Sequence, residues 1–273
     1  MYPAAKAPLS AMIQAEHLSK RFGEVVAADD ITLAIAPGEI FGLIGANGAG
    51  KTTLVKMLAT LLTPTSGTAS VAGFDTMRQS AEVRRHIGYV PQLLSADGDL
   101  TGRENMLLSA RLYALPRRER DQLIDGALSA MGLADAADRL VKTYSGGMIR
   151  RLEIAQAMLH RPDVLFMDEP TVGLDPLARD AVWEHVRMLR QSFGMTMLVT
   201  THYLEEADLL CDRIAIMQRG RFVAVGSPRD LKLAVGPNAT LDDVLVHLVG
   251  QTSEQEGGFG DVRRARHSAI VHG

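Results

Sequence analysis

The fold of this chain is decided by one stretch of its sequence, Gly45-Ala46-Asn47-Gly48-Ala49-Gly50-Lys51-Thr52. The stretch fits the pattern Gly-x-x-x-x-Gly-Lys-Ser/Thr, in which a glycine-rich turn presents successive backbone N–H groups to phosphate oxygens. A continuous apolar run, residues 40–44, comes directly before it, and residues 52–62 have helical spacing. This order of buried strand, loop and helix places a bound anion at a helix N-terminus, where the helix dipole favours it. We therefore expect a phosphate-binding loop here.

The residues of this loop have separate expected roles in holding ATP and Mg²⁺. The backbone from Gly45 to Gly50 is expected to surround the phosphates, and Lys51 to neutralise the β- and γ-phosphates. The Thr52 hydroxyl is expected to ligate Mg²⁺, and Thr53 to help hold the phosphates. The competing interpretation is an ordinary glycine-rich turn with an exposed lysine. The strand before the loop and the helix after it favour the phosphate loop.

Two adjacent carboxylates, Asp168 and Glu169, follow a second buried strand, residues 164–167. Ligands of parallel α/β sheets bind at the carboxyl ends of the strands, so this acidic pair is expected beside the phosphate loop. Asp168 is then placed to hold Mg²⁺, directly or through water, and Glu169 to polarise the attacking water as a general base. The alternative is that the two acids merely end a strand before Pro170. The neighbouring phosphate loop favours the catalytic interpretation.

The remaining pattern predicts an α/β fold with a mainly parallel sheet. Residues 195–199 form another buried-strand run, and a helix is expected over residues 175–192 with Asp175 as its N-cap. Strands that alternate with helices favour a parallel sheet covered on both faces. Between the halves, residues 100–160 have helical spacing and read as an inserted helical lobe.

The first helix of that lobe has a recognisable start. Thr101 and Glu104 form a plausible capping box. An apolar stripe is expected from Leu107, Leu108 and Leu112. Near the end of the chain, residues 222–225 read as a strand of a possible hairpin.

Composition narrows the function classes. The chain has 273 residues, 47% of them hydrophobic and 22% charged, and a formal net charge of −3, so no dominant nucleic-acid surface is expected. Its one cysteine, Cys211, favours a reducing cytoplasm. No stretch approaches the ~18 apolar residues that a membrane span needs. Any membrane role is expected to come through docking.

A further motif, Tyr144-Ser145-Gly146-Gly147-Met148, precedes a stretch with helical spacing, residues 149–159. Taken alone, its Ser-Gly-Gly is more typical of an ordinary helix cap. Its position before the carboxylate strand decides against that interpretation. With the motif in this place, the chain resembles the nucleotide-binding subunit of an ABC transporter. The resemblance implies that Ser145, Gly146 and Gly147 contact the γ-phosphate of ATP bound on an opposing subunit, at a helix N-terminus.

Other positions match the family in the same order along residues 11–233. Phe22 resembles the aromatic residue that stacks on adenine, and Gln92 resembles the glutamine that reaches Mg²⁺ and links the core to the helical lobe. Asp175 belongs to a segment that resembles the one crossing the dimer interface. His202 resembles the histidine that contacts the γ-phosphate and orients the attacking water. Met148 departs from the pattern, because many relatives have glutamine there.

The resemblance also implies an architecture and its boundaries. The fold implied is a P-loop NTPase core of the RecA-like type with an antiparallel β subdomain and an inserted α-helical subdomain at about residues 93–160. Residues 1–10 are expected to be a flexible lead, residues 11–233 the ABC ATPase domain, and residues 234–273 a partly disordered C-terminal tail.

The function implied is that of an ATP-binding and ATP-hydrolysing subunit of an exporter. Residues 144–148, 201–208 and 241–244 resemble the branch that exports drugs and antibiotics. Expected partners are a second ATPase subunit, identical to the first, and an integral membrane permease. The expected location is cytoplasmic, on the inner face of the cell membrane, and no nucleic acid is expected.

The alternative is a soluble ABC-type ATPase that acts on nucleic acid or ribosomes. Such proteins usually carry paired ATPase units or a long coiled coil. This sequence has one unit and no sustained heptads.

Overall fold

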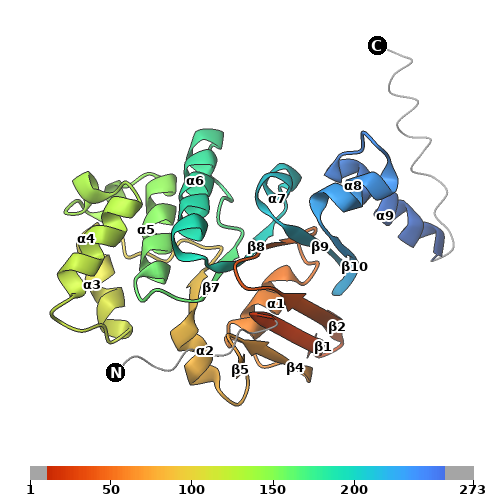
Figure 1. Ribbon diagram of the computed structural model, residues 1–273, viewed down its shortest axis with the longest axis horizontal. Helices are drawn as coiled ribbons and strands as arrows, with labels where there is room; N and C mark the ends of the chain where they lie inside the picture. Colours follow the sequence, from red (N-terminus) through yellow and green to blue (C-terminus); the bar gives the residue numbers. More distant parts are fainter. Residues whose placement is uncertain (1–10, 256–273) are drawn as a thin grey trace, which may run out of the picture.

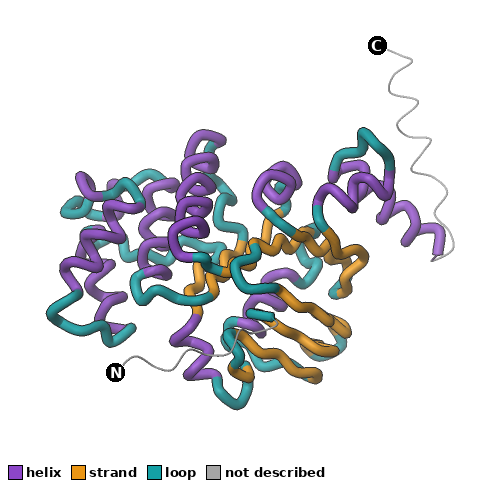
Figure 2. Tube along the Cα trace, in the orientation of Figure 1, coloured by secondary structure: helices purple, strands orange, loops and turns teal. Residues whose placement is uncertain are grey.

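The structure is a computed structural model and describes residues 11–255. The expected flexible lead, residues 1–10, and the end of the expected tail, residues 256–273, lie outside the described residues. Figure 2 shows the strands of both sheets between a helical group on one side and a pair of C-terminal helices on the other.

A mainly parallel sheet forms the centre, with strand order β10-β9-β3-β8-β7-β6. Its strands are β3 (Ile40–Ile44), β6 (Ile87–Val90), β7 (Val164–Asp168), β8 (Thr196–Thr201), β9 (Arg213–Gln218) and β10 (Arg221–Gly226). Only the β9–β10 pair is antiparallel within this sheet of the described chain. Every residue of β3, β7 and β8 is buried, which explains why these strands read as continuous apolar runs. The expected α/β fold is confirmed.

A smaller sheet is wholly antiparallel, in the order β2-β1-β4-β5. Its strands are β1 (Ile13–Phe22), β2 (Val25–Ile35), β4 (Ser66–Val71) and β5 (Phe74–Asp75). On β2, Ile31, Leu33 and Ile35 are buried while the residues between them are exposed, as their alternation predicts. This sheet is the antiparallel β part that the resemblance implied.

Helices surround the central sheet (Figure 1). They are α1 (Lys51–Leu58), α2 (Ser80–His86), α3 (Gly102–Leu112), α4 (Arg120–Ala130), α5 (Gly146–Met158), α6 (Pro176–Phe193), α7 (Leu204–Leu210), α8 (Pro228–Val235) and α9 (Leu241–Gln255), with 3₁₀ turns η1 (Ala134–Ala136) and η2 (Val141–Thr143). The start of α6 follows the prediction: the Ala178 N–H donates to Asp175 Oδ1 (3.0 Å), and Pro176 takes the first helical position. Within the described chain, no helix is both long and apolar enough to cross a lipid bilayer.

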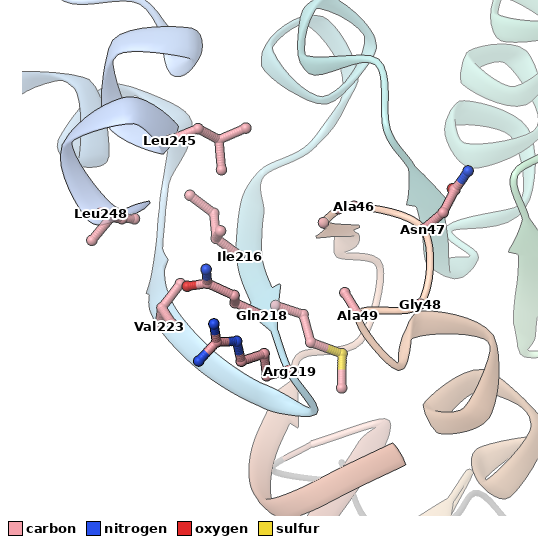
Figure 3. Close-up of a pocket in the computed structure, with 12 residues that line it drawn as sticks. Ala46, Asn47, Gly48, Ala49, Ile216, Gln218, Arg219, Val223, Leu245 and Leu248 are labelled. Carbon is pink, nitrogen blue, oxygen red and sulfur yellow. The ribbon is translucent and has the colours of Figure 1, made fainter. Parts of the chain in front are cut away.

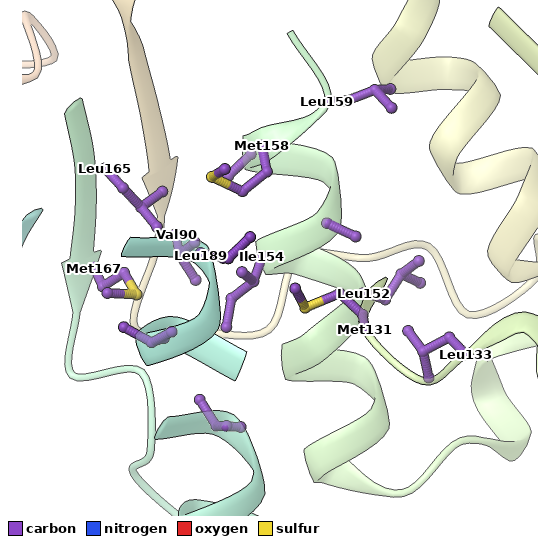
Figure 4. Packing of buried hydrophobic residues seen from close by; sticks show 14 of the residues in the cluster. Val90, Met131, Leu133, Leu152, Ile154, Met158, Leu159, Leu165, Met167 and Leu189 are labelled. Atoms are coloured by element: carbon purple, nitrogen blue, oxygen red, sulfur yellow. The ribbon is translucent and has the colours of Figure 1, made fainter. Parts of the chain in front are cut away.

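The helical group α3, α4 and α5 is inserted between β6 and β7. It does not have a core of its own, because buried side chains of α5 and α6 pack against those of β6 and β7 in one cluster. Figure 4 shows Ile154 and Met158 of α5 beside Leu165 and Met167 of β7. The helical group is therefore joined to the sheet through α5.

The predicted start of α3 is confirmed. Its predicted apolar stripe is right for Leu107, which packs against the core, but wrong for Leu108 and Leu112. The N–H of Thr101 donates to Glu104 Oε2 (2.8 Å), and the N–H of Glu104 donates to Thr101 Oγ1 (3.1 Å). Leu108 and Leu112 are 47% and 77% exposed. The buried face of α3 instead carries Met106 and Ala110, both 0% exposed, beside the polar side chains of Asn105 and Ser109.

Two polar side chains form hydrogen bonds along this buried face of α3. The Asn105 amide donates to the carbonyls of Asp97 (2.9 Å) and Thr101 (3.0 Å). Gln156 of α5 donates to Ser109 Oγ (3.0 Å) and to the Asn105 carbonyl (3.2 Å). These hydrogen bonds satisfy the polar groups on the buried face of α3, whereas Met106 and Ala110 supply its apolar contacts with the core.

The C-terminal helices pack onto the β9 side of the central sheet. Leu241 and Val244 of α9 are 3% and 2% exposed and share a cluster with Ile214 and Ile216 of β9. Residues 241–244 thus form part of the packed structure, although they fall within the stretch expected as a tail.

Candidate functional site

The predicted phosphate loop connects β3 to α1, and close packing dictates its glycines. Gly48 and Gly50 have φ angles of 82° and 107°, which residues other than glycine rarely adopt. A Cβ on Gly45 would overlap the carbonyl oxygen of Met217, and one on Gly50 would overlap the carbonyl oxygen of Ala27. The loop is therefore pressed against the backbones of β9 and β2.

The turn between β9 and β10 supports the loop with hydrogen bonds. The N–H of Gly220 donates to the carbonyl of Ala49 (2.9 Å), and the N–H of Asp29 donates to the carbonyl of Gly220 (2.8 Å). On this side the loop borders a pocket of about 280 Å³ that reaches Ile216 and the α9 residue Leu245 (Figure 3). The pocket is separate from the charged cluster described next, since the residues lining it do not include Lys51, Asp168 or Glu169.

Lys51 begins α1 and is 5% exposed. Its Nζ donates to the carbonyl oxygens of Gly45 (2.7 Å) and Ala46 (3.3 Å), and it lies 3.1 Å from Glu169 Oε1. A buried ammonium group requires such compensation. These contacts hold the charge of Lys51 at the centre of the curled loop.

Asp168, at the end of β7, is 1% exposed and joins two elements. Its Oδ1 accepts hydrogen bonds from the hydroxyls of Thr200 on β8 (2.7 Å) and Thr52 on α1 (3.1 Å). The parallel register pairs Asp168 with Thr200, so the neighbouring strand delivers this hydroxyl. A carboxylate oxygen and a threonine hydroxyl are thereby brought together directly below the phosphate loop.

Glu169 follows in a strained backbone conformation with φ 47°. Its N–H donates to Thr200 Oγ1 (2.8 Å) and to the Thr200 carbonyl (3.1 Å), which hold that conformation. Its Oε2 contacts His202 Nδ1 (3.2 Å) and accepts from Gln92 Nε2 (3.3 Å). With Lys51 on Oε1, the carboxylate has three polar neighbours from three elements.

The structure therefore brings together six of the predicted site residues, Lys51, Thr52, Gln92, Asp168, Glu169 and His202. Lys51 and Thr52 lie at the start of α1, and Gln92 lies in the loop after β6. Asp168 and Glu169 lie at the end of β7, and His202 follows β8. Thr53 lies on the first turn of α1 and is half-buried. Ala46, Asn47 and Gly48 form the exposed crest of the loop.

The Ser-Gly-Gly turn lies outside this cluster. The Ser145 hydroxyl accepts from the N–H of Met148 (3.3 Å) as the N-cap of α5, and both Ser145 and Gly146 are exposed. A Cβ on Gly147 would lie 2.9 Å from the Cβ of Ala178, and one on Gly146 would lie 3.2 Å from the Leu174 side chain. The turn is thus fitted against the start of α6, with the open N-terminus of α5 facing outward.

Phe22 and Asp175 also lie outside the cluster in the described chain. Phe22, at the end of β1, is 50% exposed, with the Lys20 ammonium 5.1 Å from the centre of its ring. Asp175 caps α6 through its contact with Ala178.

Several residues that position this site are missing from the sequence-based prediction. Thr200 is one of them. The sequence gives one signal for it, the pair Thr200-Thr201 directly before His202. Glu206 is another: its buried carboxylate accepts from the hydroxyls of Thr171 (2.7 Å) and Thr201 (2.8 Å). It ties the segment after Glu169 to the end of β8.

Tyr89 completes the surroundings of Asp168 from β6. Burial raises the pKa of its phenol to about 12, and the negative charge of Asp168 acts in the same direction. Tyr89 therefore remains neutral at physiological pH.

Together, the amide-lined loop, the lysine within it and the acidic pair on the adjacent strand define a phosphate-loop nucleoside triphosphatase. The sequence profile described as ABC transporter matches residues 28–172. The chain is 47% identical over 230 residues to the daunorubicin/doxorubicin resistance ATP-binding protein DrrA of Streptomyces peucetius, covering 83% of this chain and 68% of that protein. It is 39% identical over 246 residues to the probable multidrug ABC transporter ATP-binding protein YbhF of Escherichia coli (strain K12), covering 89% of this chain and 42% of that protein.

Solved structures show the same relationship. An ATP-binding subunit of an ABC transporter superposes with a TM-score of 0.78 at 30% identity, covering 88% of this chain and 100% of the other. A dimeric ATP-binding cassette in a post-hydrolysis state, bound to ADP and phosphate, superposes with a TM-score of 0.71 at 26% identity, covering 79% and 98%. The chain belongs to the ABC transporter family, and it is an ATP-binding, ATP-hydrolysing subunit. The relatives named here favour this interpretation over an ATPase acting on nucleic acid or ribosomes.

Proposed function

We propose that this chain drives an exporter by binding Mg·ATP at residues 45–52 and hydrolysing it with Glu169 as the general base. One observation carries the proposal: Lys51, Asp168 and Glu169 converge on the same edge of the sheet, within direct contact of the loop. Lys51 and the loop N–H groups would bind the phosphates. Glu169 would accept a proton from the attacking water.

The oxygen atoms present fit a magnesium ion. Mg²⁺ is usually held in nucleotide sites by one or two protein oxygens together with phosphate oxygens and water. Thr52 Oγ1 lies 3.1 Å from Asp168 Oδ1, and Gln92 reaches the same cluster, so these three residues would hold the ion. When bound, Mg²⁺ neutralises charge that develops on the phosphates.

His202 and Gln92 are suited to hold the general base in place. Both contact the same oxygen of Glu169, at 3.2 and 3.3 Å, which restricts the carboxylate to one orientation. His202 would in addition contact the γ-phosphate, as the family resemblance implies. Catalysis would then rest on preset geometry and charge.

We infer that the functional unit contains two such chains arranged head to tail. The Ser-Gly-Gly turn leaves the N-terminus of α5 exposed and outside the cluster around Lys51, and an anion is stabilised at such a terminus. A second copy would present Ser145, Gly146 and Gly147 to this chain's ATP, with Asp175 at the contact between copies and Phe22 against the adenine. A structural neighbour, the ATP-binding cassette bound to ADP and phosphate, is dimeric, which supports this arrangement.

The membrane partner would be an integral permease, with this chain docked peripherally on the cytoplasmic face. Exposed apolar side chains support a docking surface on the loop after β6 and on α3. They are Leu93 (81% exposed), Leu94 (50%), Leu108 (47%) and Leu112 (77%). The cargo would be a drug, an antibiotic or another hydrophobic molecule, because DrrA and YbhF are named for drug resistance and multidrug transport.

Two measurements test this function. Purified protein should release phosphate from ATP with Mg²⁺ and stop when the metal is chelated by EDTA. Affinity purification of the chain from membranes in mild detergent should recover an integral permease. Equal hydrolysis with and without Mg²⁺, or a chain that never accompanies a membrane protein, would rule the proposal out.

A further inference from the structure

A buried ion pair on α5 has no part in the chemistry described so far. Arg150 Nη1 lies 2.9 Å from Glu153 Oε2, and both side chains are only 2% exposed. Desolvation lowers the pKa of the Arg150 guanidinium, while the charge of Glu153 raises it. A buried pair of this kind is costly unless further hydrogen bonds satisfy both partners.

Those further hydrogen bonds come from the loop after β6. Arg150 donates from Nη1 to the carbonyl of Pro91 (2.6 Å) and from Nη2 to the carbonyl of Gln92 (2.7 Å). Arg150, the basic partner, therefore binds the backbone at the start of the loop.

Glu153, the acidic partner, binds the other end of the same loop. Glu153 Oε1 accepts from the N–H of Ser95, from the Ser95 hydroxyl (3.0 Å) and from the N–H of Ala96 (3.3 Å). Between these two sets of hydrogen bonds, Leu93 and Leu94 project outward, 81% and 50% exposed. Residues 91–96 have no regular secondary structure of their own, and the ion pair supplies hydrogen bonds to their backbone at both ends.

The loop and the helix each lead to a different part of the ATP site. The Gln92 side chain contacts Glu169 (3.3 Å), whereas Ser145, the N-cap of α5, stands five positions before Arg150 on the same rigid helix. We infer that Arg150 and Glu153 are positioning residues that join the loop 91–96 to α5 as one body. The position of Gln92 beside its own Glu169 and the position of the Ser145 turn are then set together. This inference rests on the proposed roles of Gln92 and Ser145.

The test compares three variants of the full chain. The double variant Arg150→Met with Glu153→Leu removes both charges and keeps the site apolar, which lets the helix remain packed. Arg150→Lys keeps a positive charge beside Glu153 but lacks the planar guanidinium, whose two separate nitrogens reach the carbonyls of Pro91 and Gln92. Arg151→Met is the matched control, because Arg151 lies next to Arg150 on α5 but donates to the carbonyl of Met131 (2.8 Å) in the helical group.

The first measurement is amide hydrogen exchange, which needs no ATPase activity. In the double variant, with a thermal melt showing that it is folded, the Ser95 and Ala96 amides should exchange at least about tenfold faster. Arg151→Met should leave them protected. Unchanged protection in the folded double variant would overturn the inference, whatever the protein's activity.

The second measurement separates coupling from mere stability. The double variant should lower kcat for ATP by about tenfold while leaving KM within about twofold, because the phosphate loop is untouched. Arg150→Lys should fall between this variant and the parent. A folded double variant with the parent kcat, or with a raised KM at the parent kcat, would overturn the inference. A parent that hydrolyses no ATP would instead contradict the proposed function, and the exchange result alone would then test whether Arg150 and Glu153 hold the loop.

Discussion

The amino group of Lys51 lies 3.1 Å from Oε1 of Glu169, and the two side chains are 5% and 6% exposed. The lysine proposed to bind the phosphates and the proposed general base are thus each other's charge partner. Neither can be removed without leaving a buried charge uncompensated. Phosphate oxygens would compete with Glu169 for the lysine, so binding of the triphosphate and freedom of the base are linked.

Replacing Glu169 by glutamine tests the assignment of the base. Glutamine keeps the shape and the contact with Gln92 but cannot accept the proton, so turnover should fall by about 10²–10⁴-fold while ATP still binds. Phosphate release and size-exclusion chromatography with ATP measure both, and an ATP-bound dimer should accumulate. Glu184→Gln, on the exposed face of α6, is the control and should keep the parent rate. Parent-like turnover in Glu169→Gln would show that another group is the base.

Replacing Lys51 by methionine separates binding from stability. The single variant should lose Mg·ATP affinity and also about 3–5 kcal/mol of unfolding free energy, because Glu169 is left buried without its cation. Adding Glu169→Gln should restore most of the stability but none of the affinity. Urea denaturation and nucleotide titration of both variants make the comparison. Independent, additive effects on stability would argue against the buried pair.

Replacing Thr200 by valine tests a residue that only the fold revealed. Valine has nearly the same shape but removes the donor to Asp168 and the side-chain acceptor of the Glu169 N–H. We expect a loss of about 1–3 kcal/mol in stability and about tenfold in kcat. The exposed Thr68→Val on β4 is the control. Parent-like kcat in Thr200→Val would mean that Glu169 does not need this support.

Alanine at Gly50 and at Gly48 should differ although both glycines have positive φ. A Cβ at Gly50 meets the Ala27 carbonyl, whereas at Gly48 nothing lies within 4 Å. Gly48→Ala should cost about 1–2 kcal/mol for its conformation alone. Gly50→Ala should cost more and weaken ATP binding, since the loop must move. Thermal denaturation and nucleotide titration decide, and equal costs at both positions would contradict the packing argument.

The sequence by itself determined whatever depends on neighbours along the chain. The phosphate loop, its flanking strand and helix, the acidic pair at the end of β7 and the caps at Thr101 and Asp175 are all local patterns. Each is specified by spacing within a few residues, so each could be predicted without knowledge of the fold. The family resemblance extended this to Gln92 and His202, which the structure brings to Glu169.

Only the tertiary structure decided which distant groups meet. Thr200 reaches Asp168 because β7 and β8 are adjacent in one parallel register, although 32 positions separate them. Arg150 grips a loop 58 and 59 positions earlier, and nothing in the period of α5 reveals it. The same limit explains the error on α3, where Met106 and Ala110, with the hydrogen-bonded Asn105 and Ser109, form the buried face in place of Leu108 and Leu112. Hydrophobic period identifies an element, but the neighbours that the tertiary structure provides, for apolar and polar groups alike, decide which of its faces is buried.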